Sequence, residues 1–110
     1  MNPAAPFACN MNALSAAQRA RHQELGKQLR PTLTAVRELR DGFEFEFPFA
    51  LPTYEALSQL TPLEHACCPF FDIAIVLRQD DKLVWVLTGR EGVKQFIRQE
   101  FESWFGGRPI

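Results

Sequence analysis

The sequence predicts an α+β domain in which helices cover one face of a four-stranded antiparallel sheet. Three observations predict it. Two pairs of segments favour strands, through β-branched residues or through a period of two; each pair is joined by turn residues and followed by apolar residues at helical spacing. The length of 110 residues suits one domain, covering residues 1–110. The expected order of elements is α-β-β-α-β-β-α, after an irregular lead-in over residues 1–12.

The first helix is expected over residues 16–30. Ser15 and Gln18 match a capping box, in which each side chain accepts the other residue's free backbone N–H. Pro31 ends the helix. Spacings of three or four residues place the following side chains on one stripe: Leu14, Ala17, Arg21, Leu25 and Leu29. The β-branched residues that follow predict a strand over residues 32–40.

The segment 43–47 alternates strictly between phenylalanine and glutamate after the turn residues Asp41 and Gly42. This alternation predicts a strand with three rings in a core and two carboxylates in water. A second helical region opens at Pro52. Pro62 is incompatible with a continuous helix, so we expect a restart there, with Thr61 as N-cap and Glu64 closing a capping box.

That short helix is expected to end at Cys68, because Pro69 disfavours helical geometry in the preceding residue. Segments 70–78 and 82–88 alternate again and predict the second pair of strands. Thr88 and Glu91 match a third capping box. A last helix is then expected to continue to Gly106 and Gly107 through this apolar stripe: Val93, Phe96, Ile97, Phe101, Trp104 and Phe105.

Composition excludes several classes of protein. The net charge of −1 and the pI near 6.1 argue against a partner held by bulk electrostatics, such as nucleic acid or an anionic membrane. The longest apolar tract, residues 73–77, is far too short to span a bilayer, and the N-terminus does not read as a secretory signal. We therefore expect a cytoplasmic protein. Exposure of Trp104 or Phe105 would mark a contact in a homodimer.

The three cysteines are the unusual feature. An odd number in a reducing compartment predicts free thiols rather than a disulfide framework. Cys67 and Cys68 are adjacent, and a kink at Pro69 would turn both sulfurs toward a common point. Cys9 lies on the lead-in and supplies the third sulfur. Three thiolates suit one thiophilic ion, namely Hg(II), Cd(II), Zn(II), Cu(I) or As(III), for sequestration, resistance or sensing.

Other polar residues near this motif have less specific roles. His65 and His22 are single histidines, which more often lie on the surface or at caps, and Glu64 already has a predicted capping role. Arg21 is expected to extend its charge to solvent from an apolar stripe, with stabilisation of a thiolate as the alternative. The metal site is therefore predicted from Cys9, Cys67 and Cys68 alone.

Two other functions stay open from the sequence. A thiol-dependent enzyme would use Cys67 or Cys68 as nucleophile or redox thiol, in organomercurial cleavage or peroxide chemistry. The negative end of a helix disfavours a nearby thiolate, and the sequence contains no Cys-x-x-Cys pair, so metal binding without catalysis is favoured. A protein-interaction module with passive cysteines is the third class.

The segment Glu64-His65-Ala66-Cys67-Cys68-Pro69-Phe70-Phe71 resembles a small, largely uncharacterised bacterial family with an acidic residue before Cys-Cys-Pro-Phe. The segment 87–97, with Thr88-Gly89-Arg90-Glu91-Gly92, is similar to that family's Thr-Gly-Pro-Glu-Gly helix start, with Arg90 in place of the proline. Residues 7–22 are similar to its N-terminal pattern, Cys9 included. The resemblance implies that the three cysteines belong together, and the cysteine pattern invites comparison with heavy-metal handling proteins.

Overall fold

A computed structural model of the chain describes residues 7–106 and contains a four-stranded antiparallel sheet. Its strands are β1 (Ala35–Leu39), β2 (Gly42–Pro48), β3 (Asp72–Leu77) and β4 (Lys82–Thr88), in the spatial order β1-β2-β4-β3. Strand β1 pairs with β2 and strand β3 pairs with β4, so each pair forms a hairpin. The two hairpins are joined by the pairing of β2 with β4. The predicted α+β class and the order α-β-β-α-β-β-α are confirmed.

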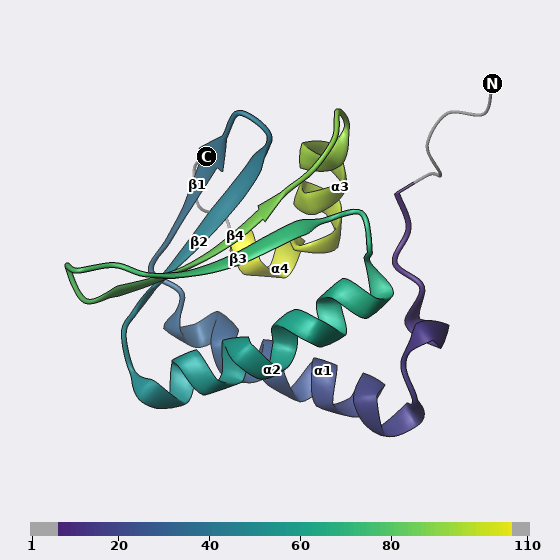
Figure 1. Cartoon of the computed structure of the whole chain (residues 1–110), viewed down its shortest axis with the longest axis horizontal. Coiled ribbons are helices and arrows are strands. Elements are labelled where there is room, and N and C mark those ends of the chain that lie inside the picture. The colour runs from purple at the N-terminus through teal and green to yellow at the C-terminus, as the bar shows by residue number, and fades with distance from the viewer. Residues whose placement is uncertain (1–6, 107–110) are drawn as a thin grey trace.

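The helices cover one face of this sheet (Figure 1). They are α1 (Ala16–Leu29), α2 (Leu51–Cys67), α3 (Val93–Glu100) and α4 (Glu102–Phe105). Phe45 and Trp85 are cross-strand neighbours on the covered face. The Phe45 ring packs against Phe101 and Trp104, and the Trp85 indole donates a 3.0 Å hydrogen bond to Thr61 of α2. Helix α1 packs against α2.

The phenylalanine row of β2 forms the centre of the core, as the alternation predicts. Phe43, Phe45 and Phe47 are all fully buried. Glu46, on the opposite face, is not the solvated residue that we expected, because only 7% of it is exposed. Its carboxylate pairs with Arg37 and with Arg78, and the pairing with Arg37 lowers the pKa of Glu46.

Helix α2 does not restart at Pro62. It runs unbroken from Leu51 to Cys67 with the proline inside it. Thr61 is not an N-cap, because its hydroxyl donates to the Leu57 carbonyl at 2.7 Å and accepts from the Trp85 indole. A proline inside a helix costs one backbone hydrogen bond. Burial of Leu57 and Leu60 before the proline and of Glu64 and Cys67 after it keeps the helix continuous.

The C-terminal helical region also differs from the expectation. Gly92, at φ 95°, is the N-cap of α3, so the predicted Thr88–Glu91 capping box does not form. The helix breaks at Phe101 instead of continuing, and the short α4 follows, capped by Gly106 in the left-handed region. The break places Phe101 and Trp104 in the core. Gly107 lies outside the described residues.

Smaller differences concern the ends of elements. The Ser15–Gln18 capping box is confirmed. Residues 30–32 form a 3-10 turn, so β1 begins at Ala35 rather than at residue 32. Residues 7–10 of the lead-in have no regular structure, residues 11–13 form a 3-10 turn, and residues 1–6 lie outside the described part.

Trp104 is 6% exposed and Phe105 is half-buried against Phe43 and Phe45, so neither is the exposed ring expected at a homodimer contact. Within residues 7–106, no helix has the length and apolar character needed to cross a membrane.

Candidate functional site: a cysteine cluster

The end of α2 brings Cys67 and Cys68 together. Cys67 is the last helical residue, and Cys68 caps the helix with a non-helical backbone, although its N–H still donates to the Glu64 carbonyl at 2.8 Å. This change of direction before Pro69 brings the two Sγ atoms within 3.7 Å of each other. The predicted kink therefore brings the sulfurs of the adjacent pair together.

The N-terminal segment passes across this helix end (Figure 1) and carries Cys9 to it. On one side of Cys9, the Asn10 N–H donates to the Cys67 carbonyl at 2.7 Å. On the other side, the Phe7 ring packs edge-on against Phe70, with centroids 5.1 Å apart. Cys9 is held between these two anchors.

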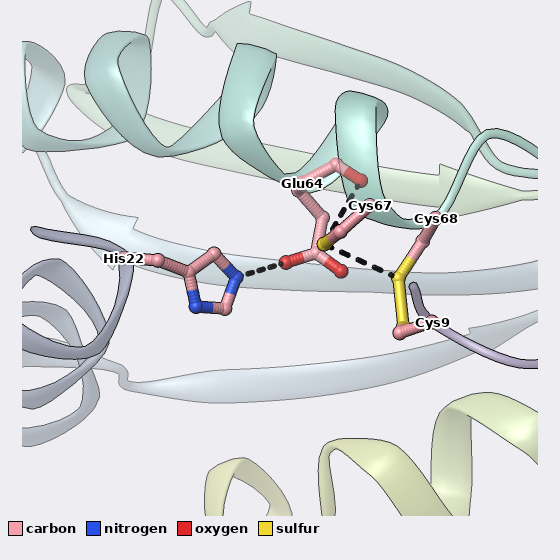
Figure 2. Close-up of a disulfide and its surroundings, with 5 residues drawn as sticks. All are labelled: Cys9, His22, Glu64, Cys67 and Cys68. Atoms are coloured by element: carbon pink, nitrogen blue, oxygen red, sulfur yellow. Dashed lines mark hydrogen bonds and ion pairs between the residues drawn. A yellow bond between two sulfur atoms is a disulfide. The ribbon is translucent and has the colours of Figure 1, made fainter. Parts of the chain in front are cut away.

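Cys9 and Cys68 form a disulfide, with Cα atoms 4.7 Å apart (Figure 2). The prediction of three free thiols was therefore wrong for these two residues, and Cys67 is the free cysteine. An odd count guarantees that one thiol stays unpaired but does not prevent two others from pairing. The anchored approach of Cys9, which no sequence pattern revealed, places its sulfur within bonding distance of Cys68.

Four potential ligand atoms converge here. The three sulfurs and a carboxylate oxygen of Glu64 all lie within 4.8 Å of one another. Cys67, Cys68 and Glu64 are buried, and Cys9 is half-buried. The structure therefore brings together the three residues that the sequence predicted, and it adds a carboxylate that we had placed elsewhere.

Glu64 does not cap a helix; it is buried, 4% exposed, and paired with His22 of α1. The His22 Nε2 atom lies 2.9 Å from Glu64 Oε1. Hydrogen bonding with Cys67 and Glu64 raises the pKa of His22 to about 9, so the imidazole is charged at neutral pH and balances the buried carboxylate. The spacing of Leu57, Leu60, Glu64 and Cys67 on one stripe of α2 was the sequence signal for this position.

The remaining candidates do not join the cluster. His65 is exposed on α2, next to the buried Glu64. Arg21 is also exposed, and its guanidinium donates to Gln59 and pairs with Glu24 rather than with a thiol. Both residues therefore belong to the solvent-facing surface of the two helices.

A cavity of about 300 Å³ borders the cluster, and Cys9 and Cys67 form part of its wall. His22 and Glu64 line it as well, and its apolar lining comes from α2, from the break between α3 and α4, and from α4: Leu60, Phe101 and Trp104. A small ligand entering this cavity would meet both sulfur atoms and aromatic rings.

Comparisons with protein-family models, with curated proteins and with solved structures gave no match for this chain. The resemblance to a small bacterial family through the Cys-Cys-Pro-Phe segment therefore stays a prediction. Function has to be argued from the cluster itself.

Proposed function

We propose that the reduced protein binds one thiophilic ion through Cys9, Cys67 and Cys68. The ions of this class are Hg(II), Cd(II), Zn(II), Cu(I) and As(III). The observation that carries the proposal is the convergence of three sulfurs and the Glu64 carboxylate within 4.8 Å. The proposed role is sequestration, resistance or sensing in the cytoplasm, without a catalytic step.

The sulfur spacing supports this reading. Two sulfurs bound to one tetrahedral ion at about 2.3 Å lie about 3.8 Å apart. Cys67 Sγ and Cys68 Sγ are already 3.7 Å apart before any ion binds. Cys9 Sγ has to move away from Cys68 Sγ by only roughly 2 Å to reach the same spacing. The segment around Cys9 has no regular secondary structure, and Ala8 and Asn10 are exposed, so we expect it to allow this movement.

The charges also support an ion here. Each thiol loses its proton on binding, and a buried thiolate without a counter-charge is costly. The charged His22 interacts with both Glu64 and Cys67, so it balances part of the negative charge and the incoming cation balances the rest. A soft ion supplies that charge and is polarizable enough to share electron density with sulfur.

The disulfide makes binding depend on redox state. Reduction of Cys9–Cys68 takes two electrons and two protons, which a thiol reductant supplies as it is itself oxidised to a disulfide. In a reducing compartment the trithiol form is expected, whereas an oxidising one keeps a single free thiol. We expect tight binding only after reduction.

Titration with Cd(II) tests this proposal, because thiolate-to-cadmium charge transfer absorbs in the ultraviolet. The reduced protein should saturate at one ion per chain. A variant with all three cysteines replaced by serine is the matched control and should show no such band. Equal affinity for both proteins would contradict the proposal, and so would equal affinity of the oxidised and reduced wild type.

A thiol-dependent enzyme is the second candidate, because the free Cys67 sulfur lies 3.7 Å from the disulfide sulfur of Cys68. Exchange requires the attacking sulfur to lie in line with the bond that breaks, which would put Cys67 Sγ about 5.7 Å from Cys9 Sγ. Those atoms lie within 4.8 Å of each other, so the sulfurs form a triangle rather than a line. The pH dependence of alkylation tests this candidate: a single thiol reacting well below pH 8 supports it, and ordinary reactivity of all three excludes it.

A further inference from the structure

The cavity beside the cluster is larger than a bare ion needs. Its volume is about 300 Å³, whereas an apolar cavity of about 150 Å³ already admits benzene. Leu60, Phe101 and Trp104 line it together with Cys9 and Cys67. A site that bound only an inorganic ion would use the sulfurs and leave this apolar wall without a ligand.

We propose that the ligand is an organic derivative of a soft metalloid, an aryl arsenical, with its arsenic on sulfur and its ring in the cavity. This inference rests on the proposed metal-binding function and names the class of ligand. Of the three cysteines, Cys9 and Cys67 line the cavity and Cys68 does not. An arsenic atom bound to Cys9 and Cys67 therefore has room for its third substituent inside the cavity, which Leu60, Phe101 and Trp104 also line.

Arsenite and phenylarsine oxide differ in the number of thiols that they bind, which separates an inorganic ligand from an aryl ligand. Arsenite, As(OH)₃, condenses with three thiols to give As(SR)₃ and three waters. Phenylarsine oxide condenses with two thiols to give PhAs(SR)₂ and one water, because the phenyl group keeps one bond to arsenic. No electrons are transferred in either step, since arsenic stays trivalent. The phenyl group replaces one sulfur and needs space that the cavity provides.

The aromatic wall gives this ring its partners. Trp104 stacks on Trp85 at 5.7 Å and packs against Phe101 at 5.8 Å, so its position is fixed by other core rings. Preformed aromatic surfaces bind a further ring at low entropic cost. Trp104 and Phe101 are both largely buried, which keeps water from most of this wall.

Gly26 offers a way to fill the cavity without touching a sulfur. It lines the cavity from α1, and a Cβ atom there would meet the mobile end of Arg30 at 3.1 Å and the Trp104 ring at 3.9 Å. A side chain larger than hydrogen also favours the helix by up to about 1 kcal/mol. Gly26→Leu therefore occupies the proposed ring site, and Gly26→Ala does so to a smaller extent. Gln28→Leu adds the same side chain at an exposed position of α1.

Isothermal titration of the reduced proteins with phenylarsine oxide and with arsenite tests the inference. Gly26→Leu should weaken phenylarsine oxide binding at least about tenfold, and Gly26→Ala less, while arsenite affinity stays within about twofold. Gln28→Leu should change neither. Equal effects on both arsenicals, or no effect of Gly26→Leu and Gly26→Ala on phenylarsine oxide, would overturn the inference but not the proposed function. If the reduced wild type bound neither arsenical nor Cd(II), both would fail.

Discussion

Removal of the Cys9–Cys68 disulfide should destabilise the protein strongly. The bond joins residues separated by 59 positions, so it closes more than half of the chain, residues 9–68, into one loop. Loss of that constraint releases chain entropy in the unfolded state worth about 4 kcal/mol at 25 °C. Residual structure in the reduced, unfolded chain subtracts from this entropy. We expect a loss of about 2–4 kcal/mol, which for a domain of this size lowers Tm by about 9–17 °C.

Urea unfolding with and without dithiothreitol measures this loss. Wild type should lose stability when the reductant is added. Cys9→Ser should match the reduced wild type and be insensitive to reductant. Cys67→Ser is the matched control, because it retains the disulfide and should respond to reductant as the wild type does. The urea concentration at the midpoint of unfolding should fall on reduction. The slope m reports any change in the compactness of the unfolded chain.

A stability difference below about 0.5 kcal/mol between oxidised and reduced wild type would refute this reasoning. It would mean that the anchors of the N-terminal segment, Asn10 on Cys67 and Phe7 on Phe70, already restrict the chain without the bond. Sensitivity of Cys9→Ser to reductant would refute the pairing itself. Either result would also change the loss of folding stability that we expect when the disulfide is reduced to the three-thiol form.

Three further predictions follow from the same structure. The pKa of His22 is raised to about 9, so its pairing stabilises the fold fully below pH 6.5, and this stabilisation is lost as the pH rises through 9. By urea unfolding, His22→Gln should therefore cost at most about 3 kcal/mol at pH 6 and almost nothing at pH 10. Gly42→Ala should cost about 3 kcal/mol by thermal unfolding, because the added Cβ would overlap the backbone of Leu87, and a neutral result would contradict the β2–β4 register. Phe45→Ala should cost about 4 kcal/mol in the same assay, because the ring is fully buried among other rings, and a loss below 1 kcal/mol would place it outside the core.

The regular elements were the predictable part of the fold. The alternation of residues 43–47 and the Ser15–Gln18 capping box are local patterns with a local physical cause, and both are confirmed. Pro62 was mispredicted because the packing of α2 on the sheet outweighs one lost backbone hydrogen bond. Glu46 was mispredicted because Arg37 of β1 and Arg78, which follows β3, cover it, and their approach to Glu46 is a tertiary property.

The candidate site was predictable only in part. The sulfur set follows from three cysteines, two of them adjacent at a helix end, and the structure brings all three together. The disulfide and the Glu64–His22 pair were not predicted, because each joins segments far apart in the sequence. The cavity depends on the break at Phe101, which turns Trp104 toward α1 and α2. No pattern in a single segment encodes such a convergence.

X-ray absorption at the zinc edge of the reduced protein tests the central claim most directly. With one equivalent of Zn(II), the account predicts a shell of three sulfurs at about 2.3 Å and one lighter neighbour, for which the Glu64 carboxylate lies closest. Serine in place of Cys9 should remove one sulfur from that shell. A shell made only of nitrogen and oxygen, or one with a single sulfur, would contradict the account.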